Sequence, residues 1–355
     1  MDYSARWYRA GDEGDIVDLL VSCLEGWPKF DLSCSPLDHW RWKYQHSLNP
    51  YNLVVAESGD KIIGCLHAIN TLIRAGDRDI LGNQGSDLVV HPDFRGLGVY
   101  SRMNDLYENS VLSYSFSGNR IVTGKATRAG GMVFPKPISL LLRIKDVDKH
   151  LAVKEEKNAF LKKYGFNTLA YFNKKRYGRN IIVDPEIELS TVNNFGDEIG
   201  ALWERVKDSL DFAVVRDTHY CNWRYGDARA GKFRVVKATK NGEIVGYTVL
   251  RVNRYDPDYH VGYVADMLTL LTEPAAQSML FNEAVEFFDD EQINCVQFLA
   301  VKDSPLMKTS LRFDFVPAPH NFMMWFSSKN SFNTDFLAGS PGERLHVTLG
   351  DTDWI

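Results

Sequence analysis

The sequence repeats itself at a spacing of about 180 residues. The block Trp42-Lys43-Tyr44 in the first half is echoed by Trp223-Arg224-Tyr225 in the second half. At nearly the same spacing, GDKIIG (residues 59–64) is echoed by NGEIVG (residues 241–246). Similar blocks that follow one another in the same order are typical of a duplicated structural unit. The pattern therefore predicts that the 355 residues fold as two copies of one domain.

Two further pairs of segments extend the repeat in both directions. Upstream, residues 15–20 (DIVDLL) resemble residues 198–203 (EIGALW). Downstream, Asp87-Leu88-Val89 resembles Asp266-Met267-Leu268. Four pairs in the same order indicate that each half is a complete copy.

The same order of elements is predicted in both copies: two helices, a β-hairpin, a long strand and another helix. We expect the Trp-basic-Tyr blocks to be buried helix ends that pack on the hairpins. The hairpins are the clearest signal, because β-branched runs flank Gly59-Asp60 in one copy and Asn241-Gly242 in the other. In the second copy we expect a strand over 263–271, a helix over 275–288, a strand over 295–301 and a short helix from about residue 303. This order predicts a mixed α/β fold.

A candidate phosphate site lies in DLVVHPDFRGLGVYSRM, residues 87–103. A β-branched strand runs through a proline turn into a glycine-containing loop that opens a helix. Glycines let the backbone approach an anion, and the N–H groups of the first helical turn point toward it. The predicted cofactor-binding residues are Leu88, Val89, Val90, Arg95, Gly96, Leu97, Gly98, Val99, Tyr100 and Ser101. The alternative is an ordinary strand-turn-helix corner.

The loop resembles the coenzyme A loop of the GNAT superfamily of N-acyltransferases, whose pattern is Arg/Gln-x-x-Gly-x-Gly/Ala. Arg95 and Gly98 match this pattern, whereas Tyr100 stands where Gly or Ala is usual. The resemblance implies a tandem duplication of the GNAT fold, with acetyl-CoA or another short acyl-CoA held by the first copy. It also implies that the thioester lies along residues 87–90.

The second copy differs at the corresponding place, where Thr272-Glu273-Pro274-Ala275 replaces the arginine and the glycines. The carboxylate of Glu273 would repel a pyrophosphate, and Pro274 lacks an N–H to donate to it. We therefore predict that the second copy is degenerate, does not bind coenzyme A and closes a substrate cleft against the first.

The domain boundaries follow from the repeat. We predict a GNAT-like domain at residues 1–150, a connector helix and loop at 151–185, a second GNAT-like domain at 186–330 and a docked C-terminal tail at 331–355. The charged stretch 144–166 is predicted to be a helix. The tail is acidic and aromatic, and in some tandem GNAT enzymes the chain end reaches the active site. That similarity makes Asp351, Asp353 and the terminal carboxylate further candidates.

Acyl transfer to an amine requires a group that accepts the proton of the amine. Asp87 is the carboxylate inside the strand that precedes the loop, so it is the first candidate for a catalytic base. Asp266 occupies the matching place in the second copy and is the second catalytic candidate, which would bind a polar substrate from the opposite wall. A shared structural role of the two aspartates is the alternative. His67 and His91 could relay protons, because imidazole titrates near neutral pH.

Composition excludes several classes of partner. A net charge of −5 provides no general basic field, so we expect no nucleic-acid partner. Because no apolar run approaches roughly 18 residues and the start of the chain is polar and acidic, we expect a cytoplasmic protein that does not enter a membrane. The five cysteines are scattered and lack CxxC spacing, so we expect neither a disulfide framework nor a metal site.

These features together predict an acyl-CoA-dependent N-acyltransferase. The expected reaction is direct attack of a primary amine on the thioester in a ternary complex. The overall similarity is to tandem GNAT enzymes that acylate nucleotide-linked amino sugars for surface polysaccharides. The alternatives are an aminoacyl-tRNA-dependent tandem GNAT transferase, against which the Arg95–Gly98 loop argues, and a non-catalytic coenzyme A-binding regulator.

Overall fold

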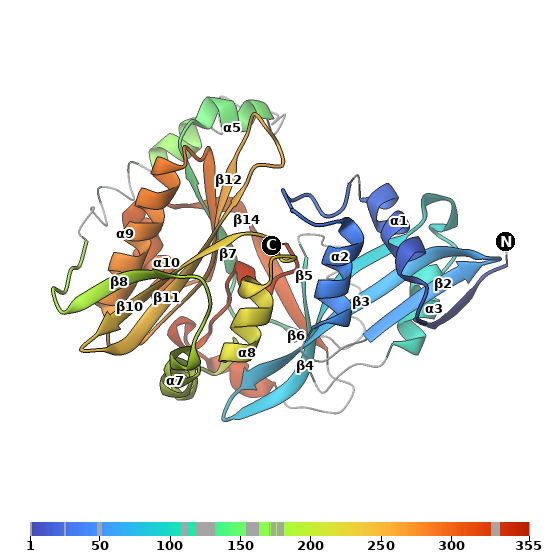
Figure 1. The fold of residues 1–355 in the computed structure, drawn as a ribbon, viewed down its shortest axis with the longest axis horizontal. Coiled ribbons are helices and arrows are strands. Elements are labelled where there is room, and N and C mark those ends of the chain that lie inside the picture. The colour runs from blue at the N-terminus through green and yellow to red at the C-terminus, as the bar shows by residue number, and fades with distance from the viewer. Residues whose placement is uncertain are drawn as a thin grey trace.

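The computed structural model describes residues 2–24, 26–47, 52–107, 112–117, 132–153, 163–169, 171, 175, 181–327 and 334–354. Two mixed sheets share one strand, in the order β1-β2-β3-β4-β5-β14-β7-β13-β12-β11-β10-β8. Figure 1 shows the two sheets side by side, with the C-terminus at the centre of the molecule and the N-terminus at the far end of the first half.

The first sheet contains β1 (Ser4–Trp7), β2 (Asn52–Ser58), β3 (Lys61–Ala75), β4 (Arg78–Val90) and β5 (Leu112–Ser117). The second contains β7 (Ile138–Ile144), β8 (Ile187–Val192), β10 (Phe233–Lys240), β11 (Glu243–Asn253), β12 (Val261–Thr269) and β13 (Cys295–Val301). The shared strand is β14 (Val316–Ser327); β6 (Met132–Val133) pairs with it, and β9 (Phe212–Val214) pairs with β3. The helices are α1 (Glu13–Cys23), α2 (Pro36–Trp40), α3 (Val99–Leu106), α5 (Val147–Val153), α7 (Asp197–Val206), α8 (Thr218–Cys221), α9 (Pro274–Asp290) and α10 (Pro305–Ser310).

The predicted duplication of a mixed α/β fold is confirmed. Helices α1 and α2, the hairpin β2–β3, strand β4 and helix α3 of the first copy correspond to α7, α8, β10–β11, β12 and α9 of the second. The turn of the second hairpin has positive φ at both central residues, 54° at Asn241 and 79° at Gly242, as its sequence favours. Both Trp-basic-Tyr blocks form a single π-helical turn, Arg41–Gln45 and Asn222–Gly226.

The two Trp blocks also join the copies to each other. Trp42 stacks on Trp223 with ring centroids 5.5 Å apart. The Nε1 of Trp42 donates to the carbonyl of Trp223 at 2.9 Å, and the Nε1 of Trp223 donates to the carbonyl of Trp42 at 3.3 Å. Reciprocal contacts of this kind define a two-fold relation. The blocks are therefore the contact between the copies as well as helix ends.

The strands do not divide between the sheets at the boundary of the repeat. β7 comes from the first half of the chain, yet it pairs along its whole length with β13, from Ile144 opposite Cys295 to Ile138 opposite Val301. β14 then pairs with both β7 and β5. The predicted helix over 144–166 is wrong at its start, because β7 extends to Ile144 and α5 begins at Val147. Residues 154–162, and much of the predicted connector 151–185, lie outside the described residues.

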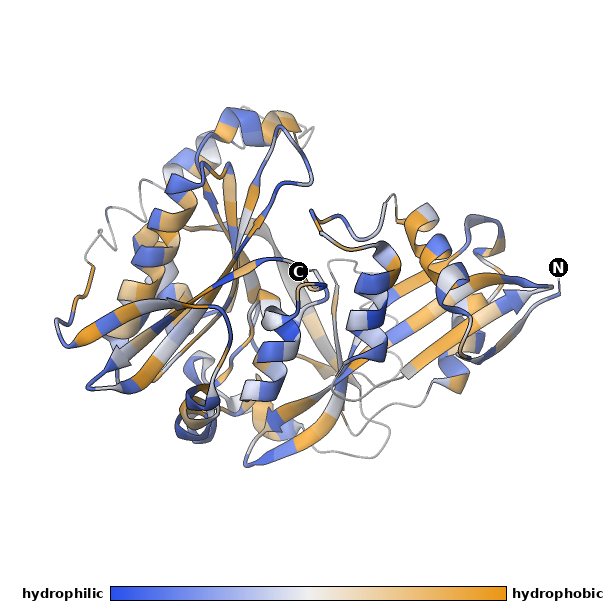
Figure 2. Ribbon diagram, viewed as in Figure 1, coloured by the Kyte–Doolittle hydropathy of each residue, from blue (hydrophilic) through white to orange (hydrophobic). Residues whose placement is uncertain are grey.

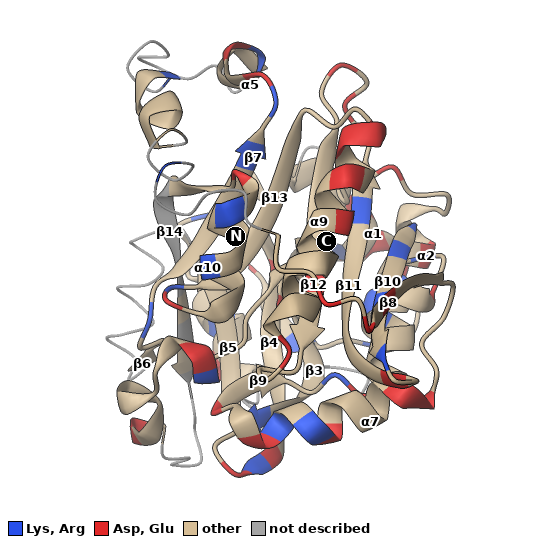
Figure 3. Ribbon diagram, turned by 90° about the vertical axis from the view of Figure 1, so that its left-hand side faces the viewer, with Lys and Arg blue, Asp and Glu red and all other residues tan. Residues whose placement is uncertain are grey.

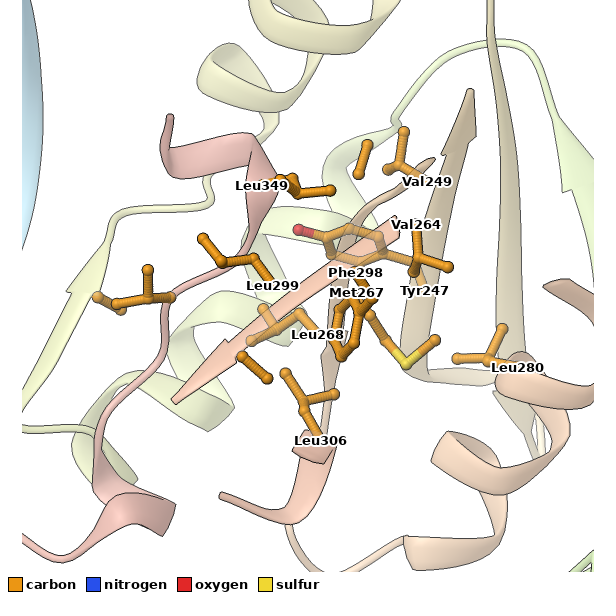
Figure 4. Packing of buried hydrophobic residues seen from close by; sticks show 14 of the residues in the cluster. Tyr247, Val249, Val264, Met267, Leu268, Leu280, Phe298, Leu299, Leu306 and Leu349 are labelled. Atoms are coloured by element: carbon orange, nitrogen blue, oxygen red, sulfur yellow. The ribbon is translucent and has the colours of Figure 1, made fainter. Parts of the chain in front are cut away.

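The C-terminal segment is part of the core of the second copy. Figure 2 shows hydrophobic stretches along the strands of both sheets. In Figure 4, Leu349 lies among core side chains that include Tyr247, Val249 and Phe298. Burial of such a side chain contributes about 1.5–3 kcal/mol, so Leu349 helps to hold the last residues of the chain against the body.

The surface carries charges of both signs. On the face shown in Figure 3, Lys and Arg stand beside Asp and Glu. Lys237 pairs with Glu198 at 2.9 Å, and Lys240 pairs with Glu273 at 3.2 Å. Among the described residues, no helix has both the length and the apolar character needed to cross a membrane.

Candidate active site

The glycine-rich loop presents an open helix N-terminus. Gly96 and Gly98 adopt left-handed φ values of 82° and 84°, and α3 begins at Val99. A Cβ on Gly96 would meet nothing within 4 Å, so the space beside the loop is open. No side chain of the described residues caps α3 at Gly98, and its first turn holds no acidic residue. The first N–H groups of α3 are therefore available to an anion, and the loop fits the pyrophosphate of coenzyme A.

Two contacts brace this loop against the first sheet. The Nε of Arg95 donates to the carbonyl of Val90 at 3.0 Å, which ties this exposed side chain to the end of β4. The hydroxyl of Tyr3 donates to the carbonyl of Leu97 at 2.8 Å. Tyr100, the departure from the family pattern, is exposed on the first turn of α3.

The second copy has no comparable opening at α9. Pro274 is the first helical residue, and the carboxylate of Glu273 before it is paired with Lys240. Ala275 and Ala276 of the first turn are buried. The cavity near this turn holds about 30 Å³, far too little for a nucleotide. We infer that the second copy does not bind coenzyme A.

Strands β4 and β5 separate beside the loop. They pair in parallel over residues 82–84 of β4, and from residue 85 to 90 the described partner of β4 is β3. Leu88, 46% exposed, lies on this open stretch. An extended ligand that ends at the loop can follow the free edge of β4 into the gap.

A bulge in β4 places Asp87. The register between β3 and β4 shifts between Cys65 and His67, and Asp87 has a φ of 35°, in the left-handed region. As a result, Ser86 and Asp87, although consecutive, both contact the hydroxyl of Tyr44. A β-bulge, in which one strand has an extra residue, redirects a side chain, and bulges are common beside active sites.

The carboxylate of Asp87 is surrounded by donors. Lys43 Nζ lies 2.8 Å from one oxygen, the hydroxyl of Tyr44 donates to the same oxygen, and Trp27 Nε1 donates to the other at 3.2 Å. Burial alone would raise the pKa of Asp87, but the charge of Lys43 and these hydrogen bonds hold the pKa below its ordinary value. Asp87 therefore stays ionised and is a weak base.

A second carboxylate reaches the bulge from the C-terminal segment. The Oδ2 of Asp353 accepts a hydrogen bond from the backbone N–H of Asp87 at 3.4 Å. Burial and the negative charge of Asp87 raise the pKa of Asp353, although Lys43 opposes them. A carboxylate whose pKa is raised toward the working pH is a stronger general base. The terminal carboxylate, the other candidate at this end, belongs to Ile355, which lies outside the described residues.

Asp266 lies in a buried ion network. It is 0% exposed and accepts hydrogen bonds from Arg216 Nε at 3.1 Å, Tyr247 at 2.9 Å and Thr348 at 2.9 Å. Despite burial, Arg216 lowers the pKa of Asp266. Arg216 also donates to Asp351 at 2.8 Å. Because none of these groups faces solvent, we infer that Asp266 and Asp351 anchor the C-terminal segment and do not contact a substrate.

The two candidate histidines have separate surroundings. His67 is buried; its Nδ1 donates to the carbonyl of Asp87 at 2.9 Å, and its Nε2 accepts from Trp40 Nε1 at 3.1 Å. Both nitrogens are used, so His67 is neutral and supports the bulge. His91 lies at the end of β4, where its Nδ1 accepts from the backbone N–H of Asp93 at 3.3 Å.

Stability is expected to fall as the pH drops below 6.5. Burial lowers the pKa of His67 from 6.5 to about 4 and that of His39 to about 3. The unfolded chain therefore binds these protons first, so the stabilisation is complete above pH 6.5 and is lost as the pH falls toward 4. Each histidine contributes up to about 1.4 kcal/mol per pH unit. Urea unfolding between pH 7 and pH 5 measures this slope, which should be smaller for His67→Asn; an equal slope would contradict the assignment.

Comparison with known proteins supports the fold. No protein-family model and no curated protein matches this chain. Among solved structures, a tandem GNAT protein from the clavulanic acid biosynthesis pathway is 13% identical over 94% of this chain and all of that one, with a TM-score of 0.57. A GCN5-related N-acetyltransferase from Anabaena variabilis is 11% identical over 91% of this chain and 72% of its own, with a TM-score of 0.59. N-myristoyltransferase from Saccharomyces cerevisiae with bound myristoyl-CoA is 11% identical over 91% of this chain and 82% of its own, with a TM-score of 0.54. With its two equivalent halves, the chain has a tandem GNAT fold.

Proposed function

We propose that this protein is an acyl-CoA-dependent N-acyltransferase that transfers an acetyl or other short acyl group to a primary amine. One observation carries the proposal: an open, uncapped helix N-terminus follows the end of β4, and a carboxyl group of raised pKa, Asp353, contacts the bulge of the same strand. The solved structures with a similar fold include N-acetyltransferases and an N-myristoyltransferase with bound myristoyl-CoA, which supports the choice of donor.

The donor would be held along β4 and α3. The backbone of the Arg95–Gly98 loop and the first N–H groups of α3 would bind the pyrophosphate, with Arg95 adding a positive charge. The edge of β4 at residues 88–90 would hold the extended arm of the donor, since the backbone N–H of Asp87 is bonded to Asp353. Acyl-CoA supplies the acyl group as a thioester, whose C–S bond breaks as the amide C–N bond forms.

Asp353 is the proposed general base, in place of the sequence-based choice of Asp87. It would take the proton that the amine loses on attack. Asp87 would assist Asp353 electrostatically, because its negative charge raises the pKa of the Asp353 carboxyl group. Lys43 and Tyr44 keep Asp87 ionised and in place. Direct attack in a ternary complex needs no other nucleophile from the protein.

The acceptor we propose to test first is a nucleotide-linked amino sugar of surface polysaccharide synthesis. This choice rests on the resemblance inferred from the sequence alone, and none of the solved structures named above is an enzyme of that kind. The proposed reaction requires only that the acceptor carries a primary amine.

Arg95→Glu is expected to weaken coenzyme A binding at least about tenfold, because it places a negative charge beside the pyrophosphate. Isothermal titration with acetyl-CoA measures the effect. Arg78→Glu is the matched control, since Arg78 is an exposed arginine at the opposite end of β4. Unchanged affinity in Arg95→Glu would reject the loop as the binding site. If the wild type binds none of several acyl-CoAs, the aminoacyl-tRNA donor becomes the better hypothesis.

A further inference from the structure

Arg251 on β11 is a buried cation that uses one of its five N–H donors in a hydrogen bond to the described residues. The side chain is 1% exposed. Its Nη1 donates to the carbonyl of Ala230 at 3.2 Å, whereas Nε and Nη2 have no hydrogen-bond partner among the described residues. Buried donors without partners destabilise a fold, so this arrangement calls for a ligand.

The two unused nitrogens form one edge of the guanidinium. Nε and Nη2 point in the same direction, and this edge binds a carboxylate or a phosphate through two parallel hydrogen bonds. Aromatic rings cover the faces of the group: the Phe30 centroid is 4.1 Å from Cζ and that of Phe233 is 5.3 Å away. A Cβ at Gly231, which has a φ of 125°, would lie 2.8 Å from Nη2, so glycine leaves the room that the group needs.

No carboxylate of the described residues neutralises this cation by direct contact. The negative charge that acts on it most strongly is Asp31, but the carboxylate of Asp31 accepts a hydrogen bond from the backbone N–H of Arg254 at 3.1 Å. Burial lowers the pKa of Arg251 to about 10, which still leaves the group charged at neutral pH.

One loop connects Arg251 with the candidate active site. In the segment between α1 and α2, Trp27 donates to Asp87 at 3.2 Å, and Phe30 covers Arg251. Trp27 and Phe30 are three residues apart, so their Cα atoms lie no more than about 11 Å from each other, and one short stretch of chain contacts both Asp87 and Arg251. Asn253 holds the same loop through the carbonyl of Lys29 and the N–H of Asp31.

We propose that Arg251 binds the anionic group of the acceptor, so that the substrate is an amine that also carries a carboxylate or a phosphate. The inference rests on the proposed function, since the amine must reach Asp353 while the anion reaches Arg251. Because Arg251 is 1% exposed, the loop that carries Phe30 would have to move aside to admit the acceptor. The second copy, which does not bind the donor, thereby contributes the specificity for the acceptor.

The test begins with Arg251→Met, which keeps the length and the apolar contacts of the side chain. Thermal unfolding is followed in the presence of inorganic phosphate or acetate. Anions that bind the folded protein and not the unfolded chain raise the midpoint of thermal unfolding. Anions bound at the Arg95 loop, which is intact in both proteins, raise this midpoint equally in the wild type and in Arg251→Met. We expect the Kd for one of these anions to rise at least about tenfold in the variant, and the anion that responds identifies the class.

Two further variants make the result specific. Arg254→Met removes one exposed positive charge from the same strand end and should leave anion binding unchanged. Arg251→Lys keeps the charge but loses the paired hydrogen bonds, so it should bind the anion more weakly than the wild type and more tightly than Arg251→Met. Removal of an unpaired buried charge should leave the unfolding midpoint without anion equal or higher. Equal anion effects in the wild type and Arg251→Met, or a lower midpoint without anion, would overturn the proposal.

A second measurement separates this inference from the proposed function. With acetyl-CoA as donor, glucosamine 6-phosphate and glucosamine are compared as acceptors, together with 4-aminobutyrate and butylamine. If phosphate is the anion that binds, we expect glucosamine 6-phosphate to have a KM at least about tenfold lower than glucosamine. If acetate binds, we expect the same of 4-aminobutyrate relative to butylamine. The preference should vanish in Arg251→Met. Anion binding without any acyl transfer would retain the Arg251 site and reject the proposed function. Acyl transfer without preference for an anionic amine would retain the proposed function and reject the role of Arg251.

Discussion

Replacing Asp353 by Asn is expected to slow acyl transfer about 100-fold or more, with coenzyme A affinity unchanged. Asparagine has the same shape, and its carbonyl oxygen can still accept the hydrogen bond from the N–H of Asp87, but it cannot take a proton from an amine. Steady-state kinetics measure kcat, and titration with acetyl-CoA measures the affinity. A fall in kcat without a change in Kd is the signature of a group that acts in the chemical step.

The pH profile makes the assignment sharper. Because the pKa of Asp353 is raised, kcat/KM of the wild type should fall as the pH drops through the pKa of Asp353. This acidic fall in kcat/KM should be missing in Asp353→Asn. Asp87→Asn is the matched variant, because loss of its charge lowers the pKa of Asp353. The acidic fall in kcat/KM should therefore occur at lower pH in Asp87→Asn. Full activity of Asp353→Asn would show that the proton leaves by another route, through Asp87 or water.

Replacing Arg216 by Met is expected to destabilise the protein by about 3–5 kcal/mol, a large part of the stability of a typical domain. Arg216 is completely buried and bridges two carboxylates, Asp266 at 3.1 Å and Asp351 at 2.8 Å. Without the guanidinium, two buried negative charges face each other with no cation between them. Urea unfolding measures the loss.

Two comparisons test the cause of that loss. Arg344→Met removes an arginine that pairs with Asp211 at 2.8 Å but is 41% exposed, and it should cost less than about 1 kcal/mol. Combining Arg216→Met with Asp266→Asn and Asp351→Asn removes the unpaired charges and should restore part of the stability. A loss below 1 kcal/mol for Arg216→Met alone would mean that the network does not hold the C-terminal segment.

Local patterns predicted the elements well where short-range physics decides them. The strand over 295–301 coincides with β13, and the Asn241-Gly242 turn adopts the positive φ values that its residues tolerate. The glycine-rich loop was found for the same reason, since a strand, a turn and a helix N-terminus all lie within residues 87–103. The repeat then implied the second copy without further information.

The candidate site depended on contacts between distant residues. The N–H of Asp87 and the carboxylate of Asp353 are separated by 266 residues, and only resemblance brought the tail into consideration. Asp87 and Asp266 occupy equivalent places, yet Lys43 pairs with one and Arg216 with the other. A single sequence holds no sign of which cation meets which carboxylate, because that depends on packing.

By itself, the sequence determined that this protein consists of two copies of a mixed α/β unit, that a strand of the first copy runs into a glycine-containing loop that opens a helix, and that the second copy lacks this loop. These properties follow from periodicity, turn chemistry and the N–H groups of one helix end, all of which act over a few residues. Only the tertiary structure decided that β7 crosses to the second sheet, that a bulge turns Asp87 toward Lys43, and that the chain end brings Asp353 to that bulge. Strand pairing and burial join residues that are far apart in sequence, and the charges and hydrogen bonds thus brought to each buried carboxylate set the pKa difference between them.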